Sequence, residues 1–163
     1  MRAMDPLQVA MTGVRMGEKY LQVFCSDVML TRGLATKIGL SGVAALAAPN
    51  EAHARQASKA AEKAGVLIDV KVTPPTRLAW EDGAFDMVVI DNTDGAFMAL
   101  ADDDRVVCLT ESRRVLRPGG RIEFIERLSQ PASVEPLLAS AQFRPVRTLA
   151  ERDGFRFVEG LKG

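Results

Sequence analysis

The stretch Glu111–Glu126, ESRRVLRPGGRIEFIE, decides the fold because it predicts a helix, a turn and a buried strand in succession. Pro118 disfavours helical geometry at the preceding residue, and Gly119-Gly120 can adopt the positive φ that ends a helix. The run Ile122–Ile125 is typical of a strand with helices on both faces. Small and apolar residues recur upstream at the spacing of one helix face: Cys108, Leu109, Ser112, Val115 and Leu116.

A second apolar run, Phe85–Asp91 (FDMVVID), precedes this helix and opens into the polar cluster that begins at Asn92. A strand, a loop, a helix and a second strand form a right-handed crossover in a parallel sheet. Ligands of such sheets bind at the carboxyl ends of the strands, so Asp91, Asn92 and Asp94 are candidate site residues. The alternative for all three is that they cap the loop.

The segment FDMVVIDN, followed by a helix and RRVLRPGGR, resembles the second half of the class I S-adenosylmethionine-dependent methyltransferase fold. The resemblance implies a Rossmann-like α/β domain that holds S-adenosylmethionine at the carboxyl edge of its sheet and methylates a small molecule. It also implies that an antiparallel hairpin completes the sheet.

The remaining sequence agrees with a doubly wound, mostly parallel sheet in a single domain over residues 1–163. Asp153-Gly154 is a hairpin signal near the C-terminus. The predicted helices cover Pro6–Thr12, Val28–Ile38, Glu51–Ala64 and Ser133–Ala141, the last capped by Ser133. The predicted strands cover Tyr20–Phe24, Val43–Ala47, Val66–Val72, Pro145–Arg152 and Phe155–Glu159.

Composition narrows the partners and the location. The formal net charge is zero and the pI is near 6.6, so no basic field favours nucleic acid or an anionic membrane. No apolar run approaches the roughly 18 residues of a membrane span, and the first residues do not resemble a signal peptide. Two cysteines without a metal-type spacing indicate reduced thiols, so we expect a cytoplasmic protein.

The loop after the first strand departs from the family pattern. In the family, glycines there let the backbone approach the cofactor closely. Aligned on that pattern, the three glycine positions fall on Phe24, Ser26 and Val28, and the acidic position falls on Gln22. Cys25 is a common residue between those glycines. Such a loop is expected to weaken or abolish cofactor binding.

Two further positions lack the carboxylates that the resemblance implies. The acceptor for the ribose hydroxyls falls on Ala48, and the adenine-reading position falls on Pro74. Asp27, with Ser26, can instead cap the following helix. The candidate cofactor-binding residues are therefore Phe24, Cys25, Ser26, Asp27, Ala48, Asn50, Pro74, Asp91 and Asn92, of which Asn50 also caps a helix. No catalytic residue or metal ligand is predicted.

Several residues have competing interpretations. Cys25 is either a core residue or a nucleophile partnered by His53. His53 shares the alanine face of its helix, Ala57, Ala60, Ala61 and Ala64, which favours a core or rim position over general-base chemistry. Asp102–Asp104 suggest N-terminal capping of a helix and compensation of its dipole more than a metal site. The arginines from Arg113 to Arg127 alternate with glutamates and are typical of a solvated face.

Two functions from different classes follow. The first is a small-molecule methyltransferase in which the altered loop still holds S-adenosylmethionine. The second is a non-catalytic methyltransferase-like domain that binds or assembles with another molecule at the same edge. Only a short link, Arg127–Ala132, follows the fifth strand, so we expect an open site and a homodimer.

Overall fold

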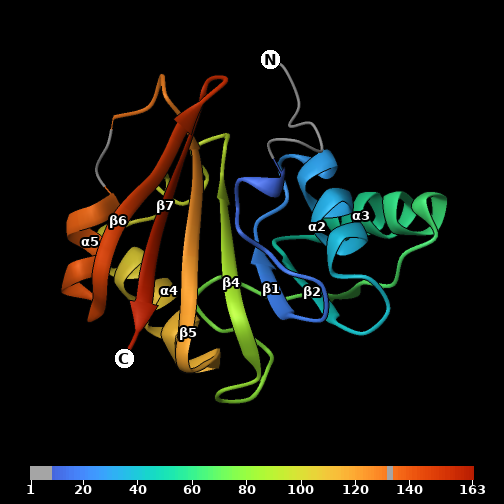
Figure 1. The fold of residues 1–163 in the computed structure, drawn as a ribbon, viewed down its shortest axis with the longest axis horizontal. Helices are drawn as coiled ribbons and strands as arrows, with labels where there is room; N and C mark the ends of the chain where they lie inside the picture. The colour runs from blue at the N-terminus through green and yellow to red at the C-terminus, as the bar shows by residue number, and fades with distance from the viewer. Residues whose placement is uncertain (1–8, 132–133) are drawn as a thin grey trace.

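In residues 9–131 and 134–163, which the computed structural model describes, seven strands form one sheet with helices on both faces (Figure 1). The strand order is β3-β2-β1-β4-β5-β7-β6. The strands are β1 (Lys19–Val23), β2 (Val43–Ala48), β3 (Asp69–Val72), β4 (Phe85–Asn92), β5 (Leu116–Arg127), β6 (Phe143–Arg152) and β7 (Phe155–Lys162). The helices are α2 (Val28–Ile38), α3 (Glu51–Ala64), α4 (Asp102–Val115) and α5 (Val134–Ser140).

The sheet is parallel from β3 to β5 and antiparallel beyond it. β1 pairs in parallel with both β2 and β4, and β2 with β3 and β4 with β5 pair in the same sense. β7 runs antiparallel to both β5 and β6. The predicted doubly wound sheet with an antiparallel C-terminal hairpin is therefore confirmed. The chain winds outward from β1 in two directions, so the topological switch point lies between β1 and β4.

Different helices cover the two faces of the sheet. One face packs against Leu109 of α4 and Leu138 of α5. The opposite face packs against Leu34 of α2 and Ala57 of α3. Side chains of β4 enter the cores on both faces because they alternate along the strand and β4 lies in the middle of the sheet. This central position explains the unbroken apolar run in its sequence.

The junction between α4 and β5 differs from the sequence prediction. α4 ends one residue before Leu116, which is already extended, with φ −77° and ψ 137°. Leu116 pairs with Phe85, and regular pairing with β4 resumes only at Arg121. Gly119, with φ of 80°, therefore shapes a bulge inside β5 and does not end the helix. Full burial of Leu116 beside β4 accounts for the early start of the strand.

The C-terminal hairpin turns where the sequence predicts. Asp153 and Gly154 have φ of 53° and 87°, which is the backbone geometry that a two-residue hairpin turn requires. Both strands are longer than predicted, because β6 begins at Phe143 and β7 continues to Lys162.

Most other bounds agree with the sequence. α2 and α3 occupy their predicted ranges, whereas β3 begins at Asp69 and not at Val66. The predicted helix over Pro6–Thr12 begins outside the described residues, and within them only residues 9–10 are helical. The predicted cap Ser133 also lies outside the described residues.

Two predictions about side chains are wrong in part. α3 buries Ala54, Ala57 and Ala61, while Ala64 is exposed. The buried stripe of α3 thus lies closer to the N-terminal end of the helix than predicted. At the start of α4, the N-cap is Ala101 and the structure contains no side-chain capping bond there. The three aspartates, Asp102–Asp104, occupy the first turn and favour the helix dipole only by their charge.

The arginine run is not a solvated face. The Arg114 guanidinium binds Glu111 and Asp82, at 2.7 and 2.8 Å, and also donates to the carbonyl oxygens of Trp80 and Leu78. It therefore fastens the loop between β3 and β4 to α4. The sequence suggested solvation because arginine and glutamate alternate, but several of these arginines cross to partners on other elements.

A second arginine, Arg121, forms part of a buried acidic cluster on the α2 face of the sheet. Its guanidinium makes two 2.8 Å bonds to the Glu18 carboxylate and lies 4.0 Å from Glu159. Glu123 is paired with Glu159 across β5 and β7 and is fully buried. Neither of its carboxylate oxygens has a hydrogen-bond partner within the described residues.

Burial raises the pKa of Glu123 well above its ordinary value. The negative charges of Glu159 and Glu18 raise it further, against a lowering effect of Arg121. A carboxyl group that binds its proton more tightly in the folded state loses folding stability as pH rises above its unfolded pKa of about 4.3. Glu123 therefore destabilises the fold increasingly as pH rises from mildly acidic values through its raised pKa.

We predict that Glu123→Gln stabilises the protein by about 1–3 kcal/mol at pH 8 and by less at pH 5, because the amide, unlike the carboxyl group, neither takes up a proton nor buries a negative charge on folding. Urea unfolding at the two pH values measures the difference. Glu62→Gln, which alters an exposed carboxylate on α3, is the control and should change the free energy of unfolding by under about 0.5 kcal/mol at both pH values. An Glu123→Gln effect that does not depend on pH would contradict the titration argument.

Candidate functional site

A pocket of about 310 Å³ lies at the switch point, where β1, β4 and β5 end. The loop from β1 into α2 forms one wall, and the residues after β4 and the end of β5 form the other. Its lining residues are Ser26, Asp27, Val28, Met29, Thr93, Asp94 and Arg127. The position is the one at which open α/β sheets bind ligands.

The Asp91 carboxylate joins the two walls of the pocket through hydrogen bonds. Its Oδ2 accepts a 3.0 Å hydrogen bond from the backbone N–H of Asp27, and its Oδ1 accepts from the N–H and the hydroxyl of Thr93. Burial raises the pKa of Asp91, and the bonds from Thr93 and from the Asp27 backbone partly offset that rise. Asp91 is fully buried. It is therefore a scaffold of the site and does not line it.

Asp27 and Ser26 take the roles predicted for a capped helix. Asp27 Oδ1 accepts from the N–H groups of Met29 and Leu30, at 3.0 and 3.3 Å, and so caps α2. The Ser26 and Thr93 hydroxyls lie 2.9 Å apart and join the two walls. Because a protein carboxylate already occupies the positive end of α2, that helix end is a poor anion site.

Phe24 stands at the first glycine position of the family and keeps a glycine-like backbone. Its φ is 66°, in the left-handed region that disfavours side chains. The ring is only 6% exposed and belongs to the core under α4. Gln22, at the family's acidic position, donates from Nε2 to the Phe24 carbonyl oxygen and to the Thr31 hydroxyl, at 2.8 and 3.0 Å. The loop is therefore held by its own side chains.

The predicted ribose position, Ala48, is fully buried in an apolar cluster. Cys25, Leu46, Ala54 and Ala57 complete that cluster beneath α3. Burial raises the pKa of the Cys25 thiol to about 12, with nearby Asp91 and Asp94 adding to the rise. A thiol that stays protonated at neutral pH is a poor nucleophile, so the core interpretation of Cys25 holds.

Three other candidate residues lie apart from the pocket. Asn50 caps α3 by accepting from the His53 N–H at 2.9 Å, and the His53 ring nitrogen Nδ1 also lies 2.9 Å from it. Pro74 is exposed in the loop after β3. Asn92 is fully buried, and its Oδ1 accepts from the N–H of Phe97. Of the nine predicted residues, only Ser26 and Asp27 line the pocket.

The sequence analysis missed three lining residues, Met29, Thr93 and Arg127. Thr93 lies within the polar cluster after β4, so its position at the end of a buried strand was a usable signal. Arg127 ends β5 and packs over the Phe155 ring, with its guanidinium carbon 4.8 Å from the ring centre. Met29 has no sequence signal, because it reaches the pocket only through the way α2 meets the sheet.

The strand order, the hairpin and the pocket at the switch point define the Rossmann-like class I methyltransferase fold. A family model described as "Methyltransferase domain" matches residues 21–124, which is more than half of the chain. The chain therefore belongs to this family of S-adenosylmethionine-dependent methyltransferases.

Individual relatives agree with the family. The chain is 28% identical over 135 residues to a ubiquinone/menaquinone biosynthesis C-methyltransferase UbiE of Hydrogenovibrio crunogenus, covering 82% of this chain and 50% of that one. It is 26% identical to the UbiE of Cupriavidus metallidurans, covering 88% of this chain and 57% of that one. The chain thus spans about half the length of these relatives.

Solved structures show the same fold at low identity. A S-adenosylmethionine-dependent methyltransferase from Aquifex aeolicus superposes with a TM-score of 0.80 at 19% identity, covering 98% of this chain and 90% of that one. The [4+2]-cyclase SpnF superposes with a TM-score of 0.72 at 15% identity, covering 96% and 80% of the two chains. The fold is therefore shared with a protein named for a different reaction.

The family implies S-adenosylmethionine, but the residues present do not fit it well. At the first glycine position, where the family's backbone comes close to the cofactor, this chain carries the side chain of Phe24. At the ribose position, Ala48 has no hydrogen-bond acceptor in its side chain and is fully buried in the core. Ribose hydroxyls without an acceptor lose about 1–3 kcal/mol each in such a setting. Two features by which the family pattern holds the cofactor, a glycine at the first loop position and an acceptor at the end of β2, are therefore absent at these positions.

We predict that Phe24→Gly is more stable than Phe24→Ala by about 1 kcal/mol, because glycine adopts φ of 66° without strain. Both variants should be about 3 kcal/mol less stable than the parent, since each loses the buried ring. Chemical denaturation gives the three free energies. At Phe97, which is buried in the same core without positive φ, glycine should be the less stable of the two replacements. The same order at both positions would argue against left-handed strain at Phe24.

Proposed function

We propose that this protein is a methyltransferase-fold domain with weak or no affinity for S-adenosylmethionine, which uses its switch-point pocket for binding and not for methyl transfer. The observation that carries the proposal is Phe24, whose left-handed backbone keeps the family's loop path while its ring fills the core. A loop closed by its own side chains stays folded without a cofactor. The domain can then persist as a binding module.

The polar character of the pocket supports this view. Ser26, Thr93, Asp94 and Arg127 place hydroxyls, a carboxylate and a guanidinium around an open space of about 310 Å³. Ligand sites combine such a hollow with a few placed polar groups. A small polar molecule bearing both a donor and an anionic group matches this set.

A second candidate is methyl transfer to a small molecule, which the family match and the UbiE relatives favour. In that case S-adenosylmethionine would supply the methyl group, and rate would come chiefly from alignment of donor and acceptor. The UbiE relatives are about twice as long as this chain, so their substrate does not transfer directly. The affinity for the cofactor separates the two candidates.

We also propose a cytoplasmic location and a homodimer. Cys25 and Cys108 are both buried and free, which agrees with a reducing compartment. None of the helices in the described part of the chain combines the length and the apolar character that crossing a membrane requires. The dimer stays a prediction from the openness of the carboxyl edge.

We predict that S-adenosylmethionine and S-adenosylhomocysteine bind with dissociation constants weaker than about 100 μM, or not measurably, because the ribose lacks an acceptor and Phe24 replaces a glycine. Titration calorimetry on the purified protein measures both. A dissociation constant in the low micromolar range would overturn the proposal and favour methyl transfer.

A revertant tests the reason for the weak binding. Phe24→Gly, Ser26→Gly and Val28→Gly combined with Ala48→Asp should gain at least tenfold in cofactor affinity, since the changes reopen the backbone approach and supply a carboxylate. The loop changes without Ala48→Asp are the matched control and should gain less. Circular dichroism establishes that each variant is folded. A folded revertant that gains no affinity would show that the lost site lay elsewhere.

A further inference from the structure

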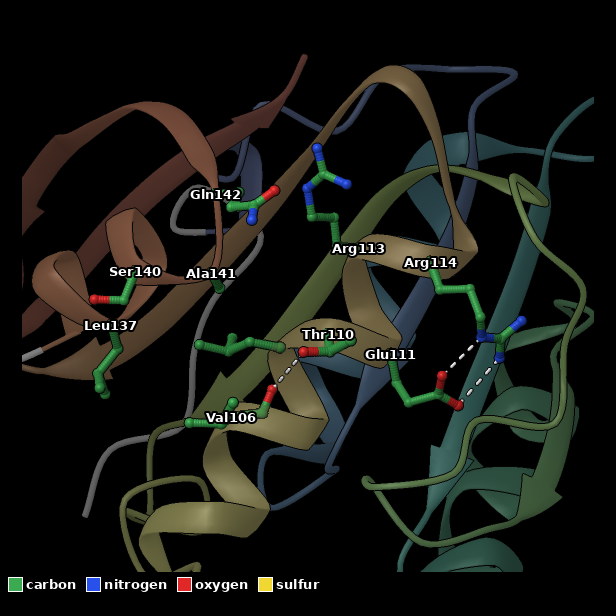
Figure 2. Close-up of a pocket in the computed structure, with 10 residues that line it drawn as sticks. Val106, Thr110, Glu111, Arg113, Arg114, Leu137, Ser140, Ala141 and Gln142 are labelled. Carbon is green, nitrogen blue, oxygen red and sulfur yellow. Dashed lines mark hydrogen bonds and ion pairs between the residues drawn. The ribbon is translucent and has the colours of Figure 1, made fainter.

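A groove of about 460 Å³ lies between α4 and α5, on the face of the sheet opposite α2 (Figure 2). Its volume is within the range of about 300–1,000 Å³ that is typical of small-molecule sites. The groove is separate from the switch-point pocket and shares no lining residue with it. Its sides are largely apolar, and they include Val106 and Leu109 of α4 and Leu137 and Ala141 at α5.

The two helices leave this groove because they rest on different parts of the sheet. α4 packs on β5, whereas α5 packs on β6 and β7. Val106, on the groove side of α4, keeps 58% of its surface exposed. An apolar side chain of this size at the wall of an open groove is a feature of binding surfaces.

One end of the groove carries positive charge without a matching carboxylate. Both nearby acids, Glu111 and Asp82, are bound by Arg114. Arg113 forms no ion pair within the described residues, and its buried Nε has no hydrogen-bond partner there. The ammonium group of Lys162 lies beside it and donates to the carbonyl oxygens of Arg113 and Leu116.

The pKa of Lys162 reflects these surroundings. Its pKa is lowered, first by burial and then by the positive charge of Arg113, while Asp82 acts in the opposite direction. Two cations are thus held together where a buried guanidinium N–H lacks an acceptor. The Arg113 guanidinium has no carboxylate partner among the described residues, and an anion in the groove would supply one.

We infer that this groove binds an amphiphile with a single carboxylate and an unbranched apolar chain, of the class of medium-chain fatty acids. The carboxylate binds Arg113, with the Gln142 amide facing it at the same end of the groove (Figure 2). The chain lies along Val106 and Leu137 toward the other end (Figure 2). A carboxylate fits because guanidinium presents paired donors in the geometry that carboxylates accept.

This inference predicts a dependence of affinity on both ends of the ligand. Each additional methylene buried in the groove should tighten binding about fourfold until the groove is filled. Decanoate should bind at least tenfold more tightly than decyltrimethylammonium, which has the same chain and a positive head. Titration calorimetry with octanoate, decanoate and dodecanoate below their micelle concentrations measures the series on the whole chain.

Arg113→Gln should weaken decanoate binding by about tenfold or more, because a charge-assisted bond is lost. Arg55→Gln removes an exposed arginine from α3 and should leave the affinity unchanged. Val106→Glu places a like charge in the groove and should abolish binding. Decanoate that binds Arg113→Gln and the parent equally, or that does not bind the parent at all, would overturn the inference.

A second copy of the chain is the competing occupant. Light scattering on the parent and on Val106→Glu distinguishes the two. A parent dimer that Val106→Glu converts to a monomer, with no decanoate binding by either, would assign the groove to self-association and overturn the ligand. A mass that Val106→Glu leaves unchanged, with decanoate binding lost, supports the fatty-acid site.

Discussion

The geometry of the carboxyl edge depends on one buried carboxylate, that of Asp91. It receives the backbone N–H of Asp27 at the start of α2 and two donors from Thr93 after β4, so the two halves of the doubly wound sheet meet on it. Burying a carboxylate costs free energy unless its oxygens are hydrogen-bonded, and at Asp91 the protein supplies every donor itself. These hydrogen bonds form without a ligand, so the two walls of the site are held together by the protein itself.

The loop between β1 and α2 keeps part of the family's pattern and loses another part. The family's loop needs glycine for two reasons, backbone conformation and room for the cofactor. In this chain the conformation survives at Phe24, whose φ is 66°, and the glycine does not, since the position carries an aromatic ring that packs into the core. Burial of an aromatic ring is worth more than the strain of about 1–2 kcal/mol that left-handed backbone costs. The loop therefore has the backbone conformation of the family pattern but carries a different side chain at this position.

The sequence predicted the architecture well because the signals are local. Helical periodicity, the hairpin dipeptide Asp153-Gly154 and the caps Asp27 and Asn50 each act within a few residues, and each is found in the structure. The site was predicted less completely. Met29 and Arg127 reach the pocket through the packing of α2 and β5, and no spacing in the sequence carries that information.

The errors have the same origin. The end of α4 was placed at the glycines because turn chemistry is visible in sequence, whereas the pairing of Leu116 with Phe85 is a tertiary contact. The arginines were read as solvated because local alternation says nothing about Arg114 reaching across to Asp82. Long side chains reach partners that are close in space even when they are distant in sequence.

The position of β7 has a consequence for how the chain is made. β7 lies between β5 and β6 although it follows both in sequence. On a ribosome that emits the chain from its N-terminus, β5 emerges with one edge bare and β6 emerges with no neighbour until β7 arrives. The unpaired N–H and C=O groups along that edge of β5, together with its apolar side chains, are then open to other nascent chains, which is the kind of exposure that chaperones bind. Synthesis of β7 closes that edge, and Lys162 fastens it to the end of α4.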